Sequence, residues 1–260
     1  MSLGALRSAV ALAAALGAEI IGAFVEDTDL LSFSALPFAT LTGSLSPRKV
    51  RMGQAELGRA MRGQASHCRE ALAREAGAQG VAWSFRVLRG NVGKELNEAS
   101  RDADLLSLGR AGISARRHSC GGFTAHASRS APLVLIQKDA HLGSEGAPVV
   151  VLTLPGERAS PLLQVAAVLA AAQGRALKVI APEGAHRSRF RRRAEELLSR
   201  WALELHWIFS RPRGTSAALV EALTGARGGV LVIDADNPWV DDRRMAALVD
   251  RSGFSLMILR

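Results

Sequence analysis

The sequence predicts an α/β protein in which helices alternate with parallel strands, and three observations support this. Short runs of near-continuous apolar residues, such as 20–25 and 149–154, are typical of strands buried on both faces. Segments of helical periodicity separate these runs. The alternation starts again after a polar, glycine-bearing stretch, so we expect two tandem domains: a first half at 1–138, a linker at 139–147 and a second half at 148–260.

The first half is expected to open with a helix over 3–16 that Gly17 ends. Five apolar residues recur in it at helical spacing: Leu3, Leu6, Val10, Ala13 and Leu16. The connection 26–47 has no period, and loops of this length are usually functional or partly folded. The other expected elements are strands at 20–25, 83–88 and 105–108, helices at 48–77 and 92–101, and a last strand after Pro132.

The second half has five expected strands joined by four helices, which is an internal repeat of the architecture. The strands are expected at 149–154, 176–180, 203–209, 230–233 and 254–259. The helices are expected at 161–173, 187–201, 216–224 and 242–252. The strand at 149–154 has no counterpart in the first half, which begins with its helix.

Composition is that of a soluble globular protein with a sizeable core, since 48% of the 260 residues are apolar and 22% are charged. No apolar run reaches the roughly 18–20 residues of a membrane helix. Arg7 before an apolar stretch could open a signal peptide, but the helical spacing favours a first helix and a cytoplasmic protein. Cys68 and Cys120 lack further metal ligands nearby, so we expect two ordinary thiols.

The formal net charge of +9 comes from 33 basic and 24 acidic residues. The densest basic cluster is Arg187, Arg189, Arg191, Arg192 and Arg193. Interleaved acidic and apolar residues indicate an amphipathic helix with a solvated basic start. A nucleic-acid stripe is the alternative, and it is disfavoured because no aromatic platform or known reader motif accompanies the arginines.

The best candidate for a ligand site is the segment 104–136, in which four glycines follow the expected strand at 105–108. They are Gly109, Gly112, Gly121 and Gly122. A turn from a parallel strand into a helix points free backbone N–H groups outward, and glycines let a phosphate approach that backbone closely. Tight turns need glycines too, so the pattern alone does not separate a phosphate loop from a turn.

Gly109-Arg110-Ala111-Gly112, followed by nine residues and Gly122, resembles the G-x2-G-x9-G-[S/T] nucleotide loop of the universal stress protein family. Phe123 stands where that family has Ser or Thr. Aligning Gly121-Gly122 with the final pair instead shortens the spacer by one residue, and both registers stay open. The stretches FVEDTDLL and ALPFA are also similar to a bacterial subset of the family, and two tandem copies of its unit account for nearly the whole chain.

This resemblance implies two Rossmann-like domains of the adenine nucleotide alpha hydrolase type, each with a parallel sheet of strand order 3-2-1-4-5. In the family, the backbone at the position of Val25 touches the base. The loop matching Gly109, Gly112 and Gly121 or Gly122 holds the phosphates. From charge and position we add Arg110, Arg116, Arg117 and Thr124 to the nucleotide-binding residues. The implied ligand is ATP, weakly bound, with Mg²⁺ only alongside the nucleotide.

The two halves depart from the family in different ways. The family's first strand, the middle of its sheet, is missing before the helix at 3–16. We therefore expect either that Met1 is not the natural start or that a strand from elsewhere fills this place. In the second half, four carboxylates stand where the glycine loop should be: Asp234, Asp236, Asp241 and Asp242. Carboxylates repel phosphate, and a helix cap with a solvated loop is favoured over a Mg²⁺ or Ca²⁺ site.

The expected function is that of a non-catalytic stress-response regulator whose first half keeps weak or vestigial adenine-nucleotide binding. It would act as a homodimer or through pairing of its two domains. One alternative is an ATP-hydrolysing enzyme of the same superfamily, although no S-G-G-x-D-S, G-x4-G-K-[S/T] or G-x-S-x-G motif occurs. Another is a basic scaffold for nucleic acid or a protein partner, with steeply salt-dependent binding. No catalytic residue and no metal site are assigned.

Overall fold

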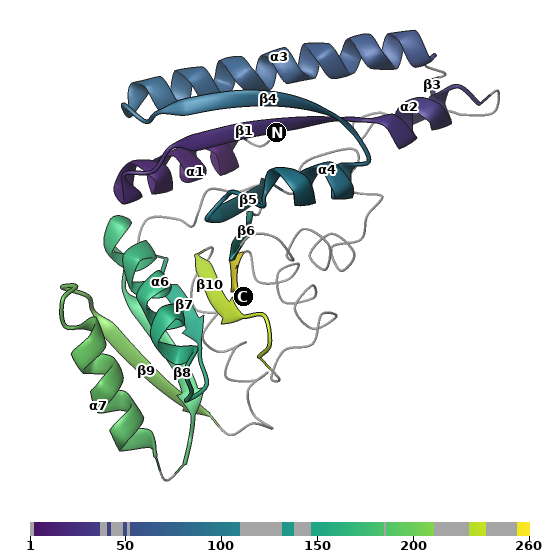
Figure 1. The fold of residues 1–260 in the computed structure, drawn as a ribbon. Coiled ribbons are helices and arrows are strands. Elements are labelled where there is room, and N and C mark those ends of the chain that lie inside the picture. The colour runs from purple at the N-terminus through teal and green to yellow at the C-terminus, as the bar shows by residue number, and fades with distance from the viewer. Residues whose placement is uncertain are drawn as a thin grey trace.

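The computed structural model describes residues 3–36, 41–42, 49–50, 53–109, 132–137, 147–184, 186–210, 229–237 and 254–260. In the first half, the elements are α1 (Leu3–Leu16), β1 (Ile20–Asp27), α2 (Thr28–Ser34), β2 (Leu41–Thr42), β3 (Lys49–Val50), α3 (Gln54–Ala78), β4 (Trp83–Gly90), α4 (Val92–Ala99), β5 (Leu105–Gly109) and β6 (Leu133–Gln137). In the second half, they are β7 (Val149–Leu152), α6 (Ala159–Ala172), β8 (Leu177–Pro182), α7 (Arg187–Leu198), β9 (Leu205–Ser210), β10 (Val230–Asp234) and β11 (Ser255–Leu259). Figure 1 shows the mixed α/β architecture that the sequence predicts.

Local chemistry explains where several of these elements begin and end. Gly17 ends α1 with a φ of 62°, a left-handed conformation that glycine adopts without steric cost. The Asp27 carboxylate accepts hydrogen bonds from the N–H groups of Asp29 and Leu30, at 3.0 and 3.1 Å, and caps α2. The connection 26–47, expected to lack a period, is therefore helical in its first part.

The five strands of the second half are mutually parallel, in the order β9-β8-β7-β10-β11. Numbered from β7, this order reads 3-2-1-4-5. Both faces of the central strands are buried, because Val149 and Val151 pack in one hydrophobic cluster with α6 while Val150 and Leu152 pack in another. Strands covered on both faces require apolar residues at every position, as the sequence of β7 has.

The expectation that each half has a sheet of its own is wrong. β6 pairs antiparallel with β11, placing Leu135 opposite Met257, and β5 pairs in parallel with β6. One seven-stranded sheet, β5-β6-β11-β10-β7-β8-β9, thus contains strands of both halves. The pairing buries Val134 and Leu135 almost completely, which stabilises the junction of the halves. Most of the expected linker at 139–147 lies outside the described residues.

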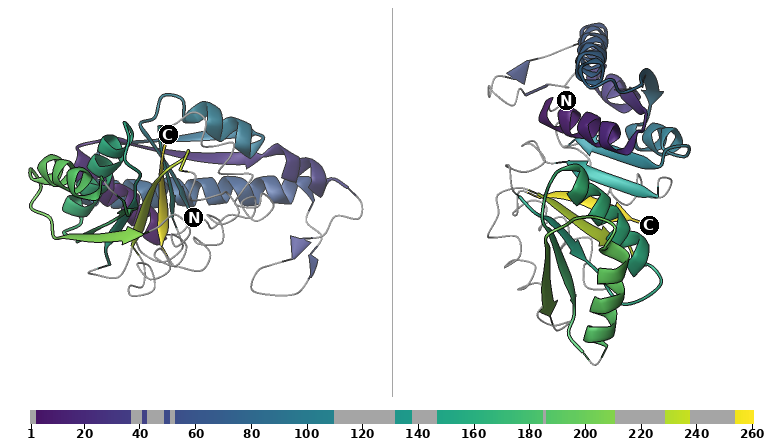
Figure 2. Two further views of the ribbon diagram at one scale, coloured as in Figure 1. Left: turned by 90° about the horizontal axis from the view of Figure 1, so that it is seen from below. Right: turned by 90° about the vertical axis from the view of Figure 1, so that its left-hand side faces the viewer.

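β1 and β4 form a separate, parallel two-stranded sheet. α3 lies on the side of these strands away from the seven-stranded sheet (Figure 2). At Gly22 a Cβ atom would lie 2.7 Å from both Leu72 Cδ2 of α3 and Phe85 Cδ2 of β4, so a side chain there would displace these two. The expectation that 20–25 is buried on both faces is wrong, since Ile21 is 46% exposed in this narrow sheet. No described helix is long and apolar enough to cross a membrane.

Candidate functional site

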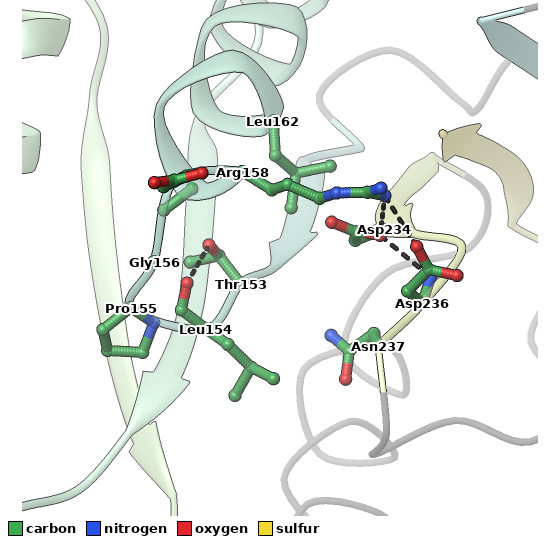
Figure 3. A pocket seen from close by; sticks show the side chains of 11 residues that line it. Thr153, Leu154, Pro155, Gly156, Arg158, Leu162, Asp234, Asp236 and Asn237 are labelled. Atoms are coloured by element: carbon green, nitrogen blue, oxygen red, sulfur yellow. Dashed lines mark hydrogen bonds and ion pairs between the residues drawn. The ribbon is translucent and has the colours of Figure 1, made fainter.

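A cavity of about 290 Å³ lies where the carboxyl ends of β7 and β10 meet the first turn of α6 (Figure 3). β7 and β10 are neighbours in the sheet, but the strands that follow them, β8 and β11, lie on opposite sides of this pair. In open α/β sheets, ligands bind at such a reversal of strand order, outside the carboxyl ends of the strands. The cavity is therefore the first candidate site among the described residues.

Arg158 connects the two strand ends across this cavity. Its Nη1 lies 3.1 Å from Asp234 Oδ1 and 2.9 Å from Asp236 Oδ2. Asp234 Oδ1 also accepts a hydrogen bond of 2.9 Å from the backbone N–H of Asp236. Glu157 lines the cavity as well, so three carboxylates and one guanidinium belong to its lining. The net negative charge disfavours a phosphate ligand at this site.

Buried polar groups hold the walls of the cavity in place. The Asn237 side-chain amide donates to the carbonyl oxygen of Leu152 at 3.5 Å, and the backbone N–H of Thr153 donates to the carbonyl oxygen of Ile180 at 3.0 Å. Asn237 is 5% exposed and Thr153 1%. These bonds join the segment after β10 to β7 and the segment after β7 to β8, and so fix the two strand ends beside the cavity.

The aspartates of this segment behave in part as the sequence predicts. Asp234 closes a turn at the end of β10, and Asp236 is exposed, which fits a solvated loop. Asp241 and Asp242 lie outside the described residues. No group of three or more potential metal ligands occurs in the parts of the chain that the structure describes.

The roles of the ion pair and the turn can be separated by two substitutions of Asp234. Asp234→Ala removes both interactions and should lower the free energy of unfolding by about 1.5–3 kcal/mol. Asp234→Asn keeps an acceptor for the Asp236 N–H and loses only the pair with half-exposed Arg158, so it should cost about 0.2–1 kcal/mol. Urea denaturation measures both values. Equal losses for the two variants would contradict a structural role of the turn.

The structure places two of the predicted nucleotide-binding residues. Val25 is half-buried on β1, and Gly109 ends β5. These strands belong to different sheets among the described residues. The remaining predicted residues lie outside the described part of the chain: Arg110, Gly112, Arg116, Arg117, Gly121, Gly122 and Thr124. The nucleotide site of the first half therefore stays a prediction.

The cavity of the second half was not predicted from the sequence, although a signal for it exists. Pro155 and Gly156 follow the buried strand β7 and precede α6, which is the strand–turn–helix pattern of a site at a sheet edge. The ion pair of Arg158 with Asp234 carries no such signal, because 76 residues separate the two side chains in the sequence.

The basic cluster on α7 has aromatic neighbours, which corrects the expectation that no aromatic platform accompanies it. Trp207 and Phe209 of β9 stack with their ring centroids 5.7 Å apart. The guanidinium carbon of Arg187 lies 4.0 Å from the Phe209 ring centroid, and that of Arg191 lies 5.8 Å from the Trp207 centroid. The arginines thus lie over the protein's own rings, where an incoming base would have to stack.

One arginine that lies outside this cavity, Arg175, has a pKa shifted by burial. Arg175 lies between the carboxyl end of α6 and the amino end of β8, whereas the cavity is at the carboxyl edge of the sheet. Desolvation lowers the pKa of its guanidinium from the ordinary value. This perturbed group is therefore not part of the candidate site.

Comparison with solved structures shows which class of fold this is. A universal stress protein from Archaeoglobus fulgidus DSM 4304 superposes with a TM-score of 0.58 at 14% identity, covering 92% of this chain and 98% of that one. This likeness shows a shared fold over nearly the whole chain. It confirms, at the level of fold, the resemblance read from the glycine spacing. No protein-family model matches the sequence, and no curated protein matches it either.

Two further structures are more distant. A functionally unknown protein from Pseudomonas aeruginosa PAO1 has a TM-score of 0.49 at 15% identity, covering 82% of this chain and 89% of that one. A universal stress protein in complex with cAMP has a TM-score of 0.36 at 21% identity, covering 45% of this chain and 98% of that one.

Proposed function

We propose that this protein is a non-catalytic regulator of the universal stress protein type that binds an adenine nucleotide weakly, and in its first half only. The observation that carries the proposal is the contrast between two corresponding strand ends. β5 ends in Gly109 and leads into the glycine-rich segment. β10 instead ends in Asp234, whose carboxylate forms an ion pair with Arg158. A glycine loop presents N–H groups to phosphate, and a carboxylate repels it.

Binding in the first half should be weak, because Phe123 replaces the Ser or Thr of the nucleotide loop. Each lost hydrogen bond to a charged group costs about 1.5–3 kcal/mol, and roughly 1.4 kcal/mol is tenfold in affinity. We expect a dissociation constant for ATP of about 10 μM or weaker. Mg²⁺ should bind only together with the nucleotide.

Replacing Gly112 by valine should abolish ATP binding. A branched side chain blocks the approach of the phosphates to the backbone and penalises a positive φ. Isothermal titration of the wild type and the variant with ATP measures the effect. Gly156→Val is the matched control, because Gly156 lines the acidic cavity of the second half and no other group lies within 4 Å of an added Cβ.

Three outcomes would contradict the proposal. ATP binding that survives Gly112→Val, or that Gly156→Val abolishes, would place the nucleotide elsewhere. A submicromolar dissociation constant would show that no anchor has been lost. Steady release of phosphate from ATP over many turnovers would favour the alternative of an ATP-hydrolysing enzyme. Titration with cAMP, which lacks the β- and γ-phosphates, measures how much of the affinity the loop contributes through them.

A further inference from the structure

Six elements of the first half have counterparts in the second half, in the same order along the chain. α1, β1, α3, β4, β5 and β6 correspond in order to α6, β8, α7, β9, β10 and β11. The pairings correspond too, because β1 pairs in parallel with β4 as β8 does with β9, and β5 with β6 as β10 does with β11. β7, which lies between β8 and β10, is the strand of the second half that has no described counterpart in the first. Among the described residues, no strand lies between β1 and β5.

The helix that would cover such a strand is present. α6 lies over β7 and also contacts β8 and β10 on either side of it. α1 contacts both β1 and β5, the two corresponding strands. In Figure 1, β4 and β5 lie on opposite sides of β1. α1 therefore spans β1 and β5 as α6 spans β8 and β10, but without a strand between them in the described chain.

Backbone hydrogen bonds show which edge of β1 is open. The N–H of Ile20 donates to the carbonyl of Ala82 at 2.9 Å, on the β4 side. Successive residues of a parallel strand direct their N–H and C=O groups to opposite edges. Ile21, Ala23 and Val25 therefore direct these groups away from β4. No described strand pairs with them there.

The same edge of β8 is filled by β7. The N–H of Leu177 donates to the carbonyl of Glu204 at 2.9 Å, just as Ile20 does to Ala82. On the other edge, the carbonyl of Ile180 accepts from Thr153 at 3.0 Å. By this alignment Ile180 corresponds to Ala23, and Ile180 is fully buried whereas Ala23 is exposed. The strand of the second half is thus buried where β7 pairs with it, and the strand of the first half is exposed at the corresponding residue.

β5 is likewise less buried than its counterpart β10. Residues 230–233 of β10 are buried, whereas Leu105, Leu106 and Leu108 of β5 are only half-buried. β5 and β10 have a similar apolar character, so their sequences do not account for the difference. No described strand pairs with β5 on the edge away from β6, whereas β7 pairs with β10 on the edge away from β11.

We propose that the first half accepts one β-strand between β1 and β5, parallel to both. The occupant is an uncharged segment, apolar on both faces and at least as long as Val149–Leu152, which fills the corresponding place in the second half. Its backbone groups would pair with those of Ile21 and Ala23, which supplies affinity as in other strand additions. Residues on one of its faces would pack under α1, which contacts both β1 and β5.

Amide hydrogen exchange on the full chain tests this proposal residue by residue. In the protein alone, the amides of Ile21, Ala23 and Val25 should exchange faster than those of Gly22, Phe24 and Glu26, because only the latter donate to β4. The probe is a synthetic peptide with the sequence of residues 147–154 and two added lysines for solubility. At saturation it should slow exchange at Ile21 and Ala23 about tenfold, the effect of one net hydrogen bond.

A matched peptide carrying Val151→Pro controls for non-specific binding. Val151 shares the hydrogen-bonding direction of Val149 and Thr153, whose N–H groups donate to the carbonyls of Ala176 and Ile180. Proline there therefore removes a donor toward the strand that corresponds to β1. This peptide should leave the exchange of Ile21 and Ala23 unchanged.

Several results would overturn the proposal. One is uniformly slow exchange along β1 in the monomeric protein alone. Another is an equal effect of both peptides, or no effect of either. Protection of Ile21 and Ala23 that disappears on dilution, together with a dimer in solution, would show that a second copy of the chain occupies the place instead.

Discussion

Gly229→Val should lower the free energy of unfolding by about 2–6 kcal/mol, because two penalties combine at this residue. Gly229 has a φ of 129°, a backbone conformation that residues with side chains rarely adopt. An added Cβ would also lie 2.5 Å from Phe254 Cε1 and 2.6 Å from the carbonyl oxygen of Pro148. The residue directly precedes β10, and its carbonyl accepts from the N–H of Ser255, so strain there misaligns β10 and β11.

Urea denaturation followed by circular dichroism measures this loss. Gly156→Val is again the matched control, because Gly156 has no positive φ and no neighbour within 4 Å of an added Cβ. The control should change the free energy of unfolding by less than about 0.5 kcal/mol. If the two variants have the same stability, the packing described around Gly229 is wrong.

Leu135→Ala should lower the free energy of unfolding by about 2–5 kcal/mol, the usual cost of removing a large buried side chain and leaving a cavity. Leu135 is 1% exposed and lies in the same hydrophobic cluster as Leu162, Leu177 and Val232 of the second half. It belongs to the first half by sequence. Its removal should therefore destabilise the sheet of the second half as well.

Hydrogen exchange shows whether this coupling exists. Leu135→Ala should accelerate amide exchange in β10 and β11 as well as in β6, because all three strands belong to one sheet. Leu36→Ala is the control, at a leucine that is 40% exposed. It should leave amide exchange in these strands unchanged and lower the free energy of unfolding by less than about 0.5 kcal/mol. Acceleration confined to β5 and β6 would mean that the halves unfold independently despite their shared sheet.

The type of each element could be read from the sequence because the cause is local. Val149–Leu152 is apolar at every position, and such a run becomes a strand wherever both faces are covered. Gly17 ends α1 by adopting a positive φ, a property of the residue itself. α2 was missed because its start depends on one cap, the Asp27 carboxylate, rather than on a periodic pattern.

The candidate site was predictable only in outline. A strand, a turn and a helix in succession indicate a site at the carboxyl edge of the sheet, and this pattern is present at both 105–112 and 149–159. Whether phosphate could enter such a site depends on which charges gather there. In the second half, Arg158 and Asp234 come together from distant parts of the sequence, and no local pattern encodes their contact.

By itself, the sequence determined the alternation of helices and strands and the burial of β7, because periodicity and apolar runs act over a few residues. Only the tertiary structure decided that β6 pairs antiparallel with β11 and that β1 and β4 stand apart. An apolar strand has the same local pattern whichever strand lies beside it. The choice of neighbour depends on how much surface the whole chain buries, which is a property of the assembled fold.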